Sequence, residues 1–513
     1  MKTLKNDILI HRFLQAAEKY QDRPALDIGN DIFSYRELLS ISSKIAGKII
    51  ELSDYTSPVG ILSEKNITAY SGILAALLAG RAYVPLNPKF PLSRNIAMLE
   101  RSKSACVIIG EEQSNLENAI REKIDRELVF VTPEKENLLK ETSIVPEIKI
   151  TGSLCSEDTA YLMFTSGTTG EPKGVPVNSS NVCSYLDHML EKYDFLPADR
   201  FSQTFDLTFD LSVHDLFLCW LSGACLTIPA SENALSFPRY INERNISVWF
   251  SVPSIAVLME KMRMLRGDYF PGLRMSFFCG EALLESTAMA SKLAAPFSTI
   301  INLYGPSETT IAVSSYEWED KDISKAKNGV VSIGKVFMDH QYCILDKDNQ
   351  AVERGEQGFL HISGQQVIGG YLDDKDNEDS FKELAKEDGR TWYNTGDLVV
   401  EDEDKDLFFL GRADHEVKIS GFRVNLHAID ETMRGISGKN NLATIAVVDE
   451  KTCTPGLVTF IETEKDEIID GDLISKCRNE LPWYMIPQRI VGIDKLPLNV
   501  NGKIDRNKLT EYL

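Results

Sequence analysis

The chain has 513 residues and a formal net charge of −21, which excludes a single small domain and argues against a nucleic-acid scaffold, because nucleic-acid phosphates repel an acidic surface. Its composition, 43% hydrophobic and 26% charged, is typical of a globular protein with a large buried core. The nine cysteines form no CxxC pair and no Cys/His cluster at metal-ligand spacing, so we expect a reduced, cytoplasmic setting and no structural zinc.

The predicted elements alternate between helices and strands. Residues 1–20 predict an amphipathic helix, since polar residues interrupt its apolar positions as they do not in a signal peptide. A helix is predicted over 67–80, and its apolar stretch is too short to cross a bilayer, so no membrane insertion is expected. Buried strands are predicted at 105–110 and 128–132, and a further helix at 286–295. This alternation favours an α/β architecture with layered sheets.

The pattern changes near residue 400. The acidic segment EDEDKD, at 401–406, is interpreted as the solvent-exposed tip of a hairpin, and the residues that follow indicate a smaller α+β unit. We place the domain boundary at Arg412 to Asp414. This predicts an N-terminal core domain of residues 1–412 and a C-terminal domain of residues 413–513.

The segment YLMFTSGTTGEPKGV, at 161–175, predicts a strand, a glycine-rich loop and a second strand that leads into a helix. Glycines let several backbone N–H groups converge, the hydroxyls add donors, and Lys173 adds positive charge, a combination that binds polyphosphate oxygens. The segment has neither the Gly-Lys-Ser/Thr of P-loop NTPases nor the GxGxxG of dinucleotide-binding folds. The alternative is a surface loop of small residues that binds nothing.

This segment resembles the phosphate-binding loop of the adenylate-forming superfamily, which includes acyl-CoA synthetases, firefly luciferase and nonribosomal peptide synthetase adenylation domains. Five further segments resemble the other family motifs, in family order: LAGRAYVPLNPKFP (78–91), NLYGPSETT (302–310), YNTGDL (393–398), GRADHEVKISGFRV (411–424) and NGKIDR (501–506). The resemblance implies a large N-terminal multi-sheet α/β domain and a small mobile C-terminal α+β domain.

The resemblance also implies a reaction in which a carboxylate attacks the α-phosphate of ATP, leaving an acyl-AMP and releasing pyrophosphate. Glu308 is implied as the Mg²⁺ ligand, Tyr304 as a flat face for adenine, Asn302 as an amide for its edge, and Asp397 with Arg412 as the ribose contacts. The full set implied to bind ATP or AMP is Thr165, Ser166, Gly167, Thr168, Thr169, Gly170, Lys173, Gly280, Glu281, Asn302, Tyr304, Asp397 and Arg412. Taken singly, each has a structural alternative as a core, turn or solvated residue.

Lys503 in NGKIDR is by its local sequence a turn residue, but the resemblance implies that it is the catalytic lysine, which bridges the attacking carboxylate and the α-phosphate. The small domain then rotates about a hinge at Asp414 and admits a thiol, and Gly421 lines the thiol channel. Relatives commonly carry a glutamate where Asn425 stands, so the sequence departs from the pattern there.

The segment TFDLSVHDLF, at 208–217, resembles amino-acid-activating members, in which the aspartate, here Asp210, pairs with the substrate ammonium group. The alternative is that Asp210 caps the helix that begins there. His214 meets either a polar substrate group or a neighbouring backbone group, and Phe277 and Leu303 narrow the pocket to a small side chain. The full substrate pocket is expected to comprise Asp210, Leu211, His214, Ser251, Phe277, Cys279, Leu303, Gly305, Ile311 and Ala312.

Several segments, among them FDLSVHDL, FFCGEAL and LPWYMIP, are similar to those of the stand-alone D-alanine–carrier protein ligases, which place a cysteine where Cys279 stands. His214 and Leu303 depart from that group, so activation of another small amino acid stays open. The chain ends eight residues after NGKID without a carrier segment, so we expect a separate phosphopantetheinylated carrier protein as acceptor. The remaining alternatives are an acyl-CoA synthetase, which Asp210 disfavours, and a catalytically silent binding protein, which Lys503 and Glu308 disfavour.

Overall fold

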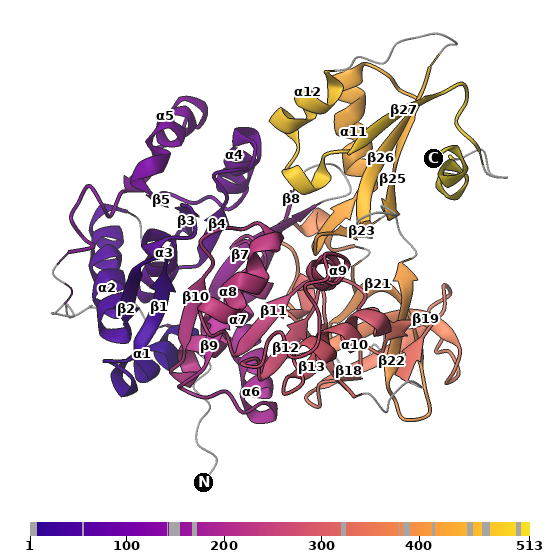
Figure 1. The fold of residues 1–513 in the computed structure, drawn as a ribbon. Coiled ribbons are helices and arrows are strands. Elements are labelled where there is room, and N and C mark those ends of the chain that lie inside the picture. Colours follow the sequence, from indigo (N-terminus) through magenta and orange to yellow (C-terminus); the bar gives the residue numbers. More distant parts are fainter. Residues whose placement is uncertain are drawn as a thin grey trace.

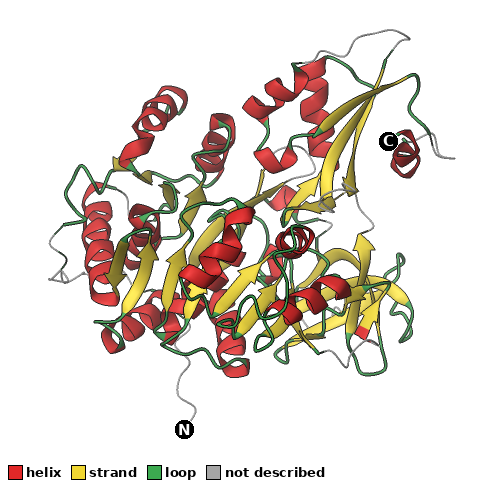
Figure 2. Ribbon diagram, in the orientation of Figure 1, coloured by secondary structure: helices red, strands yellow, loops and turns green. Residues whose placement is uncertain are grey.

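The computed structural model describes residues 8–53, 56–140, 142, 154–166, 172–319, 325–378, 380–382, 390–412, 416–448, 455–463, 472–498 and 504–513. Figure 1 shows a large unit built from most of the chain, with a smaller unit of C-terminal elements at the upper right. Figure 2 shows strands and helices interleaved throughout the large unit. The predicted α/β architecture with several sheets is therefore confirmed.

The first sheet of the large unit has six strands in the order β6-β5-β3-β4-β7-β8. Its inner pairs are parallel, whereas β7 and β8, the strands on either side of the predicted glycine-rich loop in the sequence, pair antiparallel. The strands are β3 (Val59–Leu62), β4 (Tyr83–Leu86), β5 (Cys106–Ile109), β6 (Val129–Val131), β7 (Thr159–Ser166) and β8 (Pro172–Asn178).

The second sheet has nine strands in the order β17-β14-β13-β12-β11-β9-β10-β1-β2 and is parallel in its centre. In a parallel arrangement the carboxyl ends of β11, β12 and β13 meet at one edge, where ligands commonly bind. The strands are β1 (Pro24–Ile28), β2 (Asp31–Ser34), β9 (Arg200–Ser202), β10 (Cys225–Ile228), β11 (Val248–Ser251), β12 (Met275–Phe278), β13 (Thr299–Tyr304), β14 (Ser314–Trp318) and β17 (Lys335–Val336).

Helices cover both faces of these two sheets, which explains the near-continuous apolar strands. In β5, Cys106 and Ile108 join the largest core cluster, while Val107 and Ile109 join a cluster on the other face, as a period of two requires. The largest cluster contains side chains from both sheets and from α1, α2, α3, α6 and α7. The helices are α1 (Leu9–Lys19), α2 (Tyr35–Leu52), α3 (Ile67–Leu78), α4 (Leu92–Arg101), α5 (Ser114–Lys123), α6 (Ser179–Lys192), α7 (Leu211–Ser222), α8 (Phe237–Glu243), α9 (Pro253–Lys261) and α10 (Glu285–Ala294), with short 3-10 turns η1 (Glu111–Gln113), η2 (Ala234–Ser236) and η3 (Ser307–Thr309).

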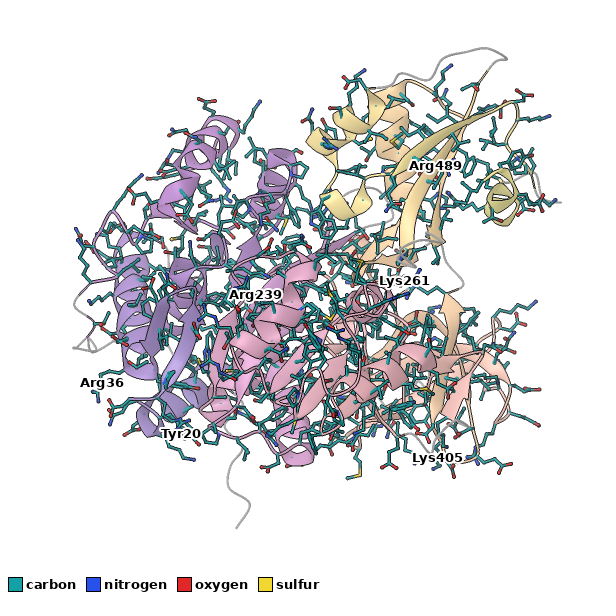
Figure 3. All side chains as sticks on the ribbon, in the orientation of Figure 1. Tyr20, Arg36, Arg239, Lys261, Lys405 and Arg489 are labelled. Atoms are coloured by element: carbon teal, nitrogen blue, oxygen red, sulfur yellow. The ribbon has the colours of Figure 1, made fainter. Side chains whose placement is uncertain are left out.

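A third, antiparallel sheet completes the large unit, and its β21–β22 hairpin has the acidic segment at its tip. The tip is not simply solvated. Lys325 Nζ lies 2.8, 2.8 and 2.9 Å from carboxylate oxygens of Asp402, Asp404 and Asp406, and Asp406 is buried. Figure 3 labels Lys405 at this edge of the molecule. The elements are β18 (His340–Leu345), β19 (Gln357–Gly364), β20 (Phe381–Lys382), β21 (Trp392–Glu401), β22 (Leu407–Arg412), η5 (Asp374–Asp376) and a separate pair, β15 (Ala326–Lys327) and β16 (Val330–Val331).

The small unit contains a two-stranded hairpin and a three-stranded sheet with helices on it, so the predicted α+β unit is confirmed. Residues 413–415, where we place the domain boundary, lie outside the described residues, and the boundary stays a prediction. Figure 1 shows the C-terminus beyond β25, on the side away from α11. The elements are β23 (Glu416–Ile419), β24 (Phe422–Asn425), α11 (Leu426–Ser437), β25 (Leu442–Val448), β26 (Pro455–Glu462), α12 (Leu473–Glu480), η6 (Trp483–Met485), β27 (Arg489–Ile493) and η7 (Arg506–Tyr512).

Aromatic rings join the two units. The Phe422 ring of β24 stacks on Tyr484 at 3.9 Å between centroids and on Phe209 of the large unit at 5.3 Å. Tyr484 in turn meets the ring of Phe90, which belongs to the same core cluster as the small unit. Such ring pairs contribute about 0.5–1.5 kcal/mol each to stability beyond the contribution of their buried area, so they stabilise one orientation of the small unit on the large unit.

The described cysteines form no disulfide. Across the described ranges, helices are too short or too polar to cross a membrane. The predicted cytoplasmic location stays a prediction.

A matched pair of glycines tests the packing of α1 and α7. Gly223 ends α7 with φ +78°, and a Cβ there would lie 2.6 Å from the ring of Tyr20, which Figure 3 labels. We expect Gly223→Ala to lower the free energy of unfolding by about 1–3 kcal/mol, because the left-handed backbone is strained and the ring must move. Gly47 in α2 has open space around it, so Gly47→Ala should raise that free energy by about 0.5–1 kcal/mol. Urea unfolding measures both; a Gly223→Ala variant as stable as the parent contradicts this packing.

Candidate active site

A cavity of about 540 Å³ lies where β7, β8 and the third sheet meet the β23–β24 hairpin. Thr165 and Ser166 line it from the end of β7, and Lys173 lines it from the start of β8. Lys173 Nζ lies 3.8 Å from an Asp376 oxygen and 5.1 Å from the centroid of the Tyr371 ring. Gly167, Thr168, Thr169 and Gly170 lie outside the described residues. The described part of the predicted phosphate loop therefore borders an open, polar cavity.

The small unit contacts this loop directly. Ser166 Oγ donates a hydrogen bond to the backbone oxygen of Arg423 at 2.6 Å and accepts one from the backbone N–H of Asn425 at 3.1 Å. Asn425 stands where relatives commonly carry a glutamate. Its side chain caps α11 by accepting hydrogen bonds from the N–H groups of His427 and Ala428. The β24 strand is thus fixed at the phosphate loop by one hydroxyl and at its own helix by one amide.

Glu308 lies on η3 with 1% of its side chain exposed. Its carboxylate accepts hydrogen bonds from the Tyr371 hydroxyl at 2.5 Å and from Arg423 Nη1 at 3.0 and 3.2 Å. Burial alone would raise the pKa of Glu308, but the Arg423 charge and the Tyr371 hydroxyl reverse this, and the pKa lies below its usual range. Glu308 is therefore an ionised, buried carboxylate that is compensated by a cation.

A second buried carboxylate pairs with Arg412, which lines the cavity. Asp397 is 2% exposed and accepts from the Tyr304 hydroxyl at 2.5 Å and from Arg412 Nη1 at 2.6 Å. Arg412 also pairs with Glu416 of β23 at 2.8 Å, and Glu416 accepts from Arg423. Tyr304, Asp397 and Arg412, which the sequence predicts together around a nucleotide, are thus in direct contact.

A smaller cavity of about 30 Å³ adjoins Tyr304. It is lined by Gly280, Glu281 and Asn302, together with Lys418 of β23. The Asn302 side-chain amide donates to the backbone oxygen of Ser332 at 2.8 Å, so one of its two N–H donors is used within the protein. The residues predicted at the adenine therefore lie side by side.

Asp210 stands at the start of α7 and is buried. Its side chain makes no capping hydrogen bond, so the alternative that Asp210 serves as a helix cap is wrong. Burial raises the pKa of Asp210 to about 6, against the opposing effect of the Ser307 hydroxyl, and its Oδ2 atom has no hydrogen-bond partner among the described residues. A buried carboxylate with an unpartnered oxygen is prepared for a charged donor from outside the chain.

The loop opposite Asp210 has a strained backbone. Thr310 and Ile311 both have positive φ, +57° and +70°, although neither is a glycine. Gly305 lies so close to this loop that a Cβ there would be 2.6 Å from the Ala312 Cα atom. Two adjacent strained residues cost of order 1–3 kcal/mol each, and such strain clusters at ligand sites.

His214 is fully buried on α7, where the Tyr185 hydroxyl lies 2.6 Å from its Nδ1 atom. The Phe250 and Phe277 rings lie 4.3 and 5.1 Å from its own, between centroids, and burial lowers its pKa to about 3. The expected backbone partner is therefore wrong, since the partner is a side-chain hydroxyl. Its Nε2 atom has no hydrogen-bond partner among the described residues.

The remaining predicted pocket residues are buried and lie near the ends of neighbouring strands, on α7 or in the loop before β14. Ser251 accepts a hydrogen bond from the Trp249 indole at 3.0 Å, and burial raises the pKa of the Cys279 thiol to about 12, so the thiol is neutral. The buried set comprises Leu211, Ser251, Phe277, Cys279, Leu303, Ile311 and Ala312.

Gly421 joins β23 to β24 with φ +83°, and its N–H donates to Glu281 at 2.9 Å. A Cβ at Gly421 would lie 2.4 Å from Val252 and 3.1 Å from Phe209. Both of those residues line a further cavity of about 360 Å³ between the two units. Asp414 and Lys503 lie outside the described residues, but Ile504 forms a β-bridge with Leu498 and packs on the three-stranded sheet.

Residues 13–372 match the AMP-binding enzyme family. The chain belongs to that family. It is 29% identical over 512 residues to a D-alanine–D-alanyl carrier protein ligase of Bacillus licheniformis, an alignment that covers 98% of this chain and 99% of the relative. It is 30% identical to part of bacitracin synthase 3 of the same species, covering 99% of this chain and 8% of the synthase. A solved structure of the Vibrio cholerae adenylation domain AlmE in complex with glycyl-adenosine-5'-phosphate has 29% identity and a TM-score of 0.87, covering 100% of this chain and 98% of AlmE. The resemblance and the implied two-unit fold are confirmed, and this AMP-binding enzyme uses ATP.

Some residues of the AMP-binding enzyme's cavity were missed by sequence reasoning. Arg423, Glu416 and Lys418 lie within a quoted motif, and their alternation along a hairpin was a signal that they share a face. Tyr371 and Tyr185 gave no such signal, because each meets its partner only through tertiary packing.

The buried Asp210 should leave a pH signature in the ligand-free AMP-binding enzyme. Its folded pKa of about 6 lies above the ordinary 3.8, so the native state binds more protons than the unfolded chain between these values. The stability from this group is present at low pH and is lost as the pH rises through about 6. We expect Asp210→Asn to remove this loss, which amounts to about 3 kcal/mol at most. Urea unfolding of parent and variant from pH 4 to 7.5 measures the difference; parallel profiles would contradict it.

Proposed function

We propose that this AMP-binding enzyme activates a small amino acid as its aminoacyl-AMP, releasing pyrophosphate, and then transfers it to the phosphopantetheine thiol of a separate carrier protein. A narrower alternative is a D-alanine–carrier protein ligase, supported by Cys279 at the end of β12 and by the relative of that name. An acyl-CoA synthetase is disfavoured, since it has no use for the Asp210 carboxylate.

The observation that carries the proposal is the buried oxygen of Asp210 that has no hydrogen-bond partner in the described part of the chain. A substrate ammonium group supplies the missing charged donor, and such a pair is strong in a dry pocket. Pairing also favours the ionised carboxylate, so amino-acid binding lowers the pKa of Asp210 from its raised value.

A small side chain fits the residues around Asp210. Phe277 and His214 pack edge to face at 5.1 Å, and Leu303 is buried beside them on the next strand. The AlmE structure, solved in complex with glycyl-adenosine-5'-phosphate, and the D-alanyl relative support the same size range. His214 closes the pocket as a neutral ring held by Tyr185.

A Mg²⁺ ion fits the carboxylate of Glu308. This side chain is buried and ionised, so it needs a cation, and Mg²⁺ is usually held by one or two carboxylates together with substrate phosphates. When bound, the ion would screen the charge of the phosphates.

In the first step, the amino-acid carboxylate forms a bond to the α-phosphorus, and the bond from that phosphorus to the pyrophosphate oxygen breaks. Asp210 orients the amino acid, Asp397 with Arg412 holds the ribose, and Tyr304 holds the adenine. Ser166 and Lys173, with Gly167–Gly170, hold the departing phosphates. Lys503 enters with the small unit and stabilises charge on the reacting oxygens.

In the second step, a thiol attacks the carbonyl carbon of the adenylate, and AMP leaves. The small unit lies here with the β23–β24 hairpin at the active site, an arrangement that suits this step. Gly421 lies at the cavity of about 360 Å³ between the units, through which we propose that the thiol arm enters.

Replacement of Asp210 separates the amino-acid ligase from the acyl-CoA synthetase. We expect Asp210→Ala to cost about 2–5 kcal/mol in kcat/KM for amino-acid-dependent pyrophosphate exchange, the range for truncating one member of a buried charge pair. The KM for ATP should change little, because the nucleotide is held by other residues. The assay compares small L- and D-amino acids with their des-amino counterparts.

Asp215 offers the matched control, since it is equally buried on the same helix. Asp215→Asn should leave the KM for the amino acid close to that of the parent. Undiminished exchange by Asp210→Ala, or equal parent activity on des-amino acids, would overturn the amino-acid assignment.

Lys503 should act only in the first step. We expect Lys503→Ala to lower adenylate formation by about 100- to 1,000-fold, the loss seen when one stabilising donor is removed, while transfer from a supplied aminoacyl-AMP to the carrier is kept. Lys508 is the control, because it is exposed on the same terminal segment and pairs with Asp505. Single-turnover measurements of both steps test this, and equal losses in both would contradict it.

A further inference from the structure

The carboxylate of Glu308 is held by a cation that comes from the other unit. Arg423 Nη1 lies 3.0 and 3.2 Å from its two oxygens, and these residues are 115 positions apart in the sequence. The Tyr371 hydroxyl donates a further hydrogen bond to this carboxylate, and the Tyr393 hydroxyl also favours its ionised form. Since Glu308 is almost fully buried, removal of Arg423 would leave its charge uncompensated.

A metal ion and Arg423 cannot both take this place. An ion bound at about 2.0–2.1 Å from a Glu308 oxygen would lie against a guanidinium that already contacts both oxygens, and two cations at that separation repel strongly. The guanidinium is therefore an internal substitute for the ion.

The same strand also engages the phosphate loop. Backbone groups of Arg423 and Asn425 use both the donor and an acceptor position of the Ser166 hydroxyl. That hydroxyl is one of the donors assigned above to the departing phosphates. In this position β24 therefore occupies both Glu308, which we propose holds the metal ion, and Ser166, which we propose holds a phosphate.

Arg423 is itself held in position by the nucleotide end of the cavity. Its Nε donates to Glu416, which also accepts from Arg412, and Arg412 pairs with Asp397. The charges alternate along this chain from Glu308 to Asp397, so the seating of Arg423 is coupled to residues placed at the ribose.

We propose that Arg423 is a positioning residue that exchanges with the metal ion on Glu308, so that the β23–β24 hairpin seats only after the ion and pyrophosphate have left. This rests on the proposed function, in which Glu308 holds the ion during adenylate formation. The exchange gives the two steps their order, because the seating needed for thiol transfer is incompatible with an occupied metal and pyrophosphate site.

Binding of Mn²⁺, followed by electron paramagnetic resonance without nucleotide, tests the exchange directly. We expect Arg423→Gln to bind one Mn²⁺ about tenfold more tightly than the parent, because the competing cation is gone. Arg423→Lys keeps the charge and should stay close to the parent. Adding Glu308→Gln to Arg423→Gln should abolish the gained site, which separates it from binding to other acidic residues.

Arg489, exposed on β27 and labelled in Figure 3, provides the control, and Arg489→Gln should bind Mn²⁺ as the parent does. A second measurement needs no variant: Mn²⁺ with pyrophosphate should speed hydrogen exchange at the Asn425 amide of the parent, which donates to Ser166. Equal Mn²⁺ affinities of parent and Arg423→Gln, or unchanged exchange at Asn425, would overturn the proposal. Pyrophosphate exchange by the parent tests the proposed function separately.

Discussion

Buried charge is the constraint on which this active site depends. Glu308 and Asp397 are both nearly inaccessible to solvent, and an ionised carboxylate in such a place must have a cation beside it. In the seated arrangement those cations are Arg423 and Arg412, with Glu416 between them. Because Glu416 and Arg423 belong to the small unit, the large unit cannot satisfy its own site without either a ligand or its partner unit.

This dependence explains why the contact between the units combines two kinds of interaction. Stacked rings of Phe209, Phe422 and Tyr484 supply a non-polar contact whose strength does not depend on the charge at Glu308. The ion pairs at Glu308 respond to whatever else binds there. A contact between the units that depends partly on ion pairs can be broken by an ion that binds to one of the paired groups. An entirely apolar contact of similar size would not respond to that ion.

Burial also acts on the carboxylate at the substrate side of the site, but there the pKa is raised, whereas that of Glu308 is lowered. Burial raises the pKa of Asp210, and one of its oxygens has no hydrogen-bond partner among the described residues. Its ionisation therefore costs free energy, which the proposed substrate ammonium group would offset. The strained backbone at Thr310 and Ile311 adds a further free-energy cost to the folded protein. The free protein is therefore less stable than its fold allows, which is the usual cost of a preorganised site.

The sequence by itself determined the elements and the family. Apolar periodicity located α1, α3, α10, β5 and β6, because burial on one or two faces imposes a period on the local sequence. Six ordered motifs indicated the family and predicted the nucleotide-binding residues. The sequence alone did not determine which side chains contact one another in the folded protein. The pairing of His214 with Tyr185, of Lys325 with the acidic hairpin, and of Arg423 with Glu308 joins residues 29 or more positions apart, and such contacts are set by how sheets and units pack. Only the tertiary structure brings Arg423 of the hairpin to Glu308, and from this contact we propose that the hairpin and a metal ion compete.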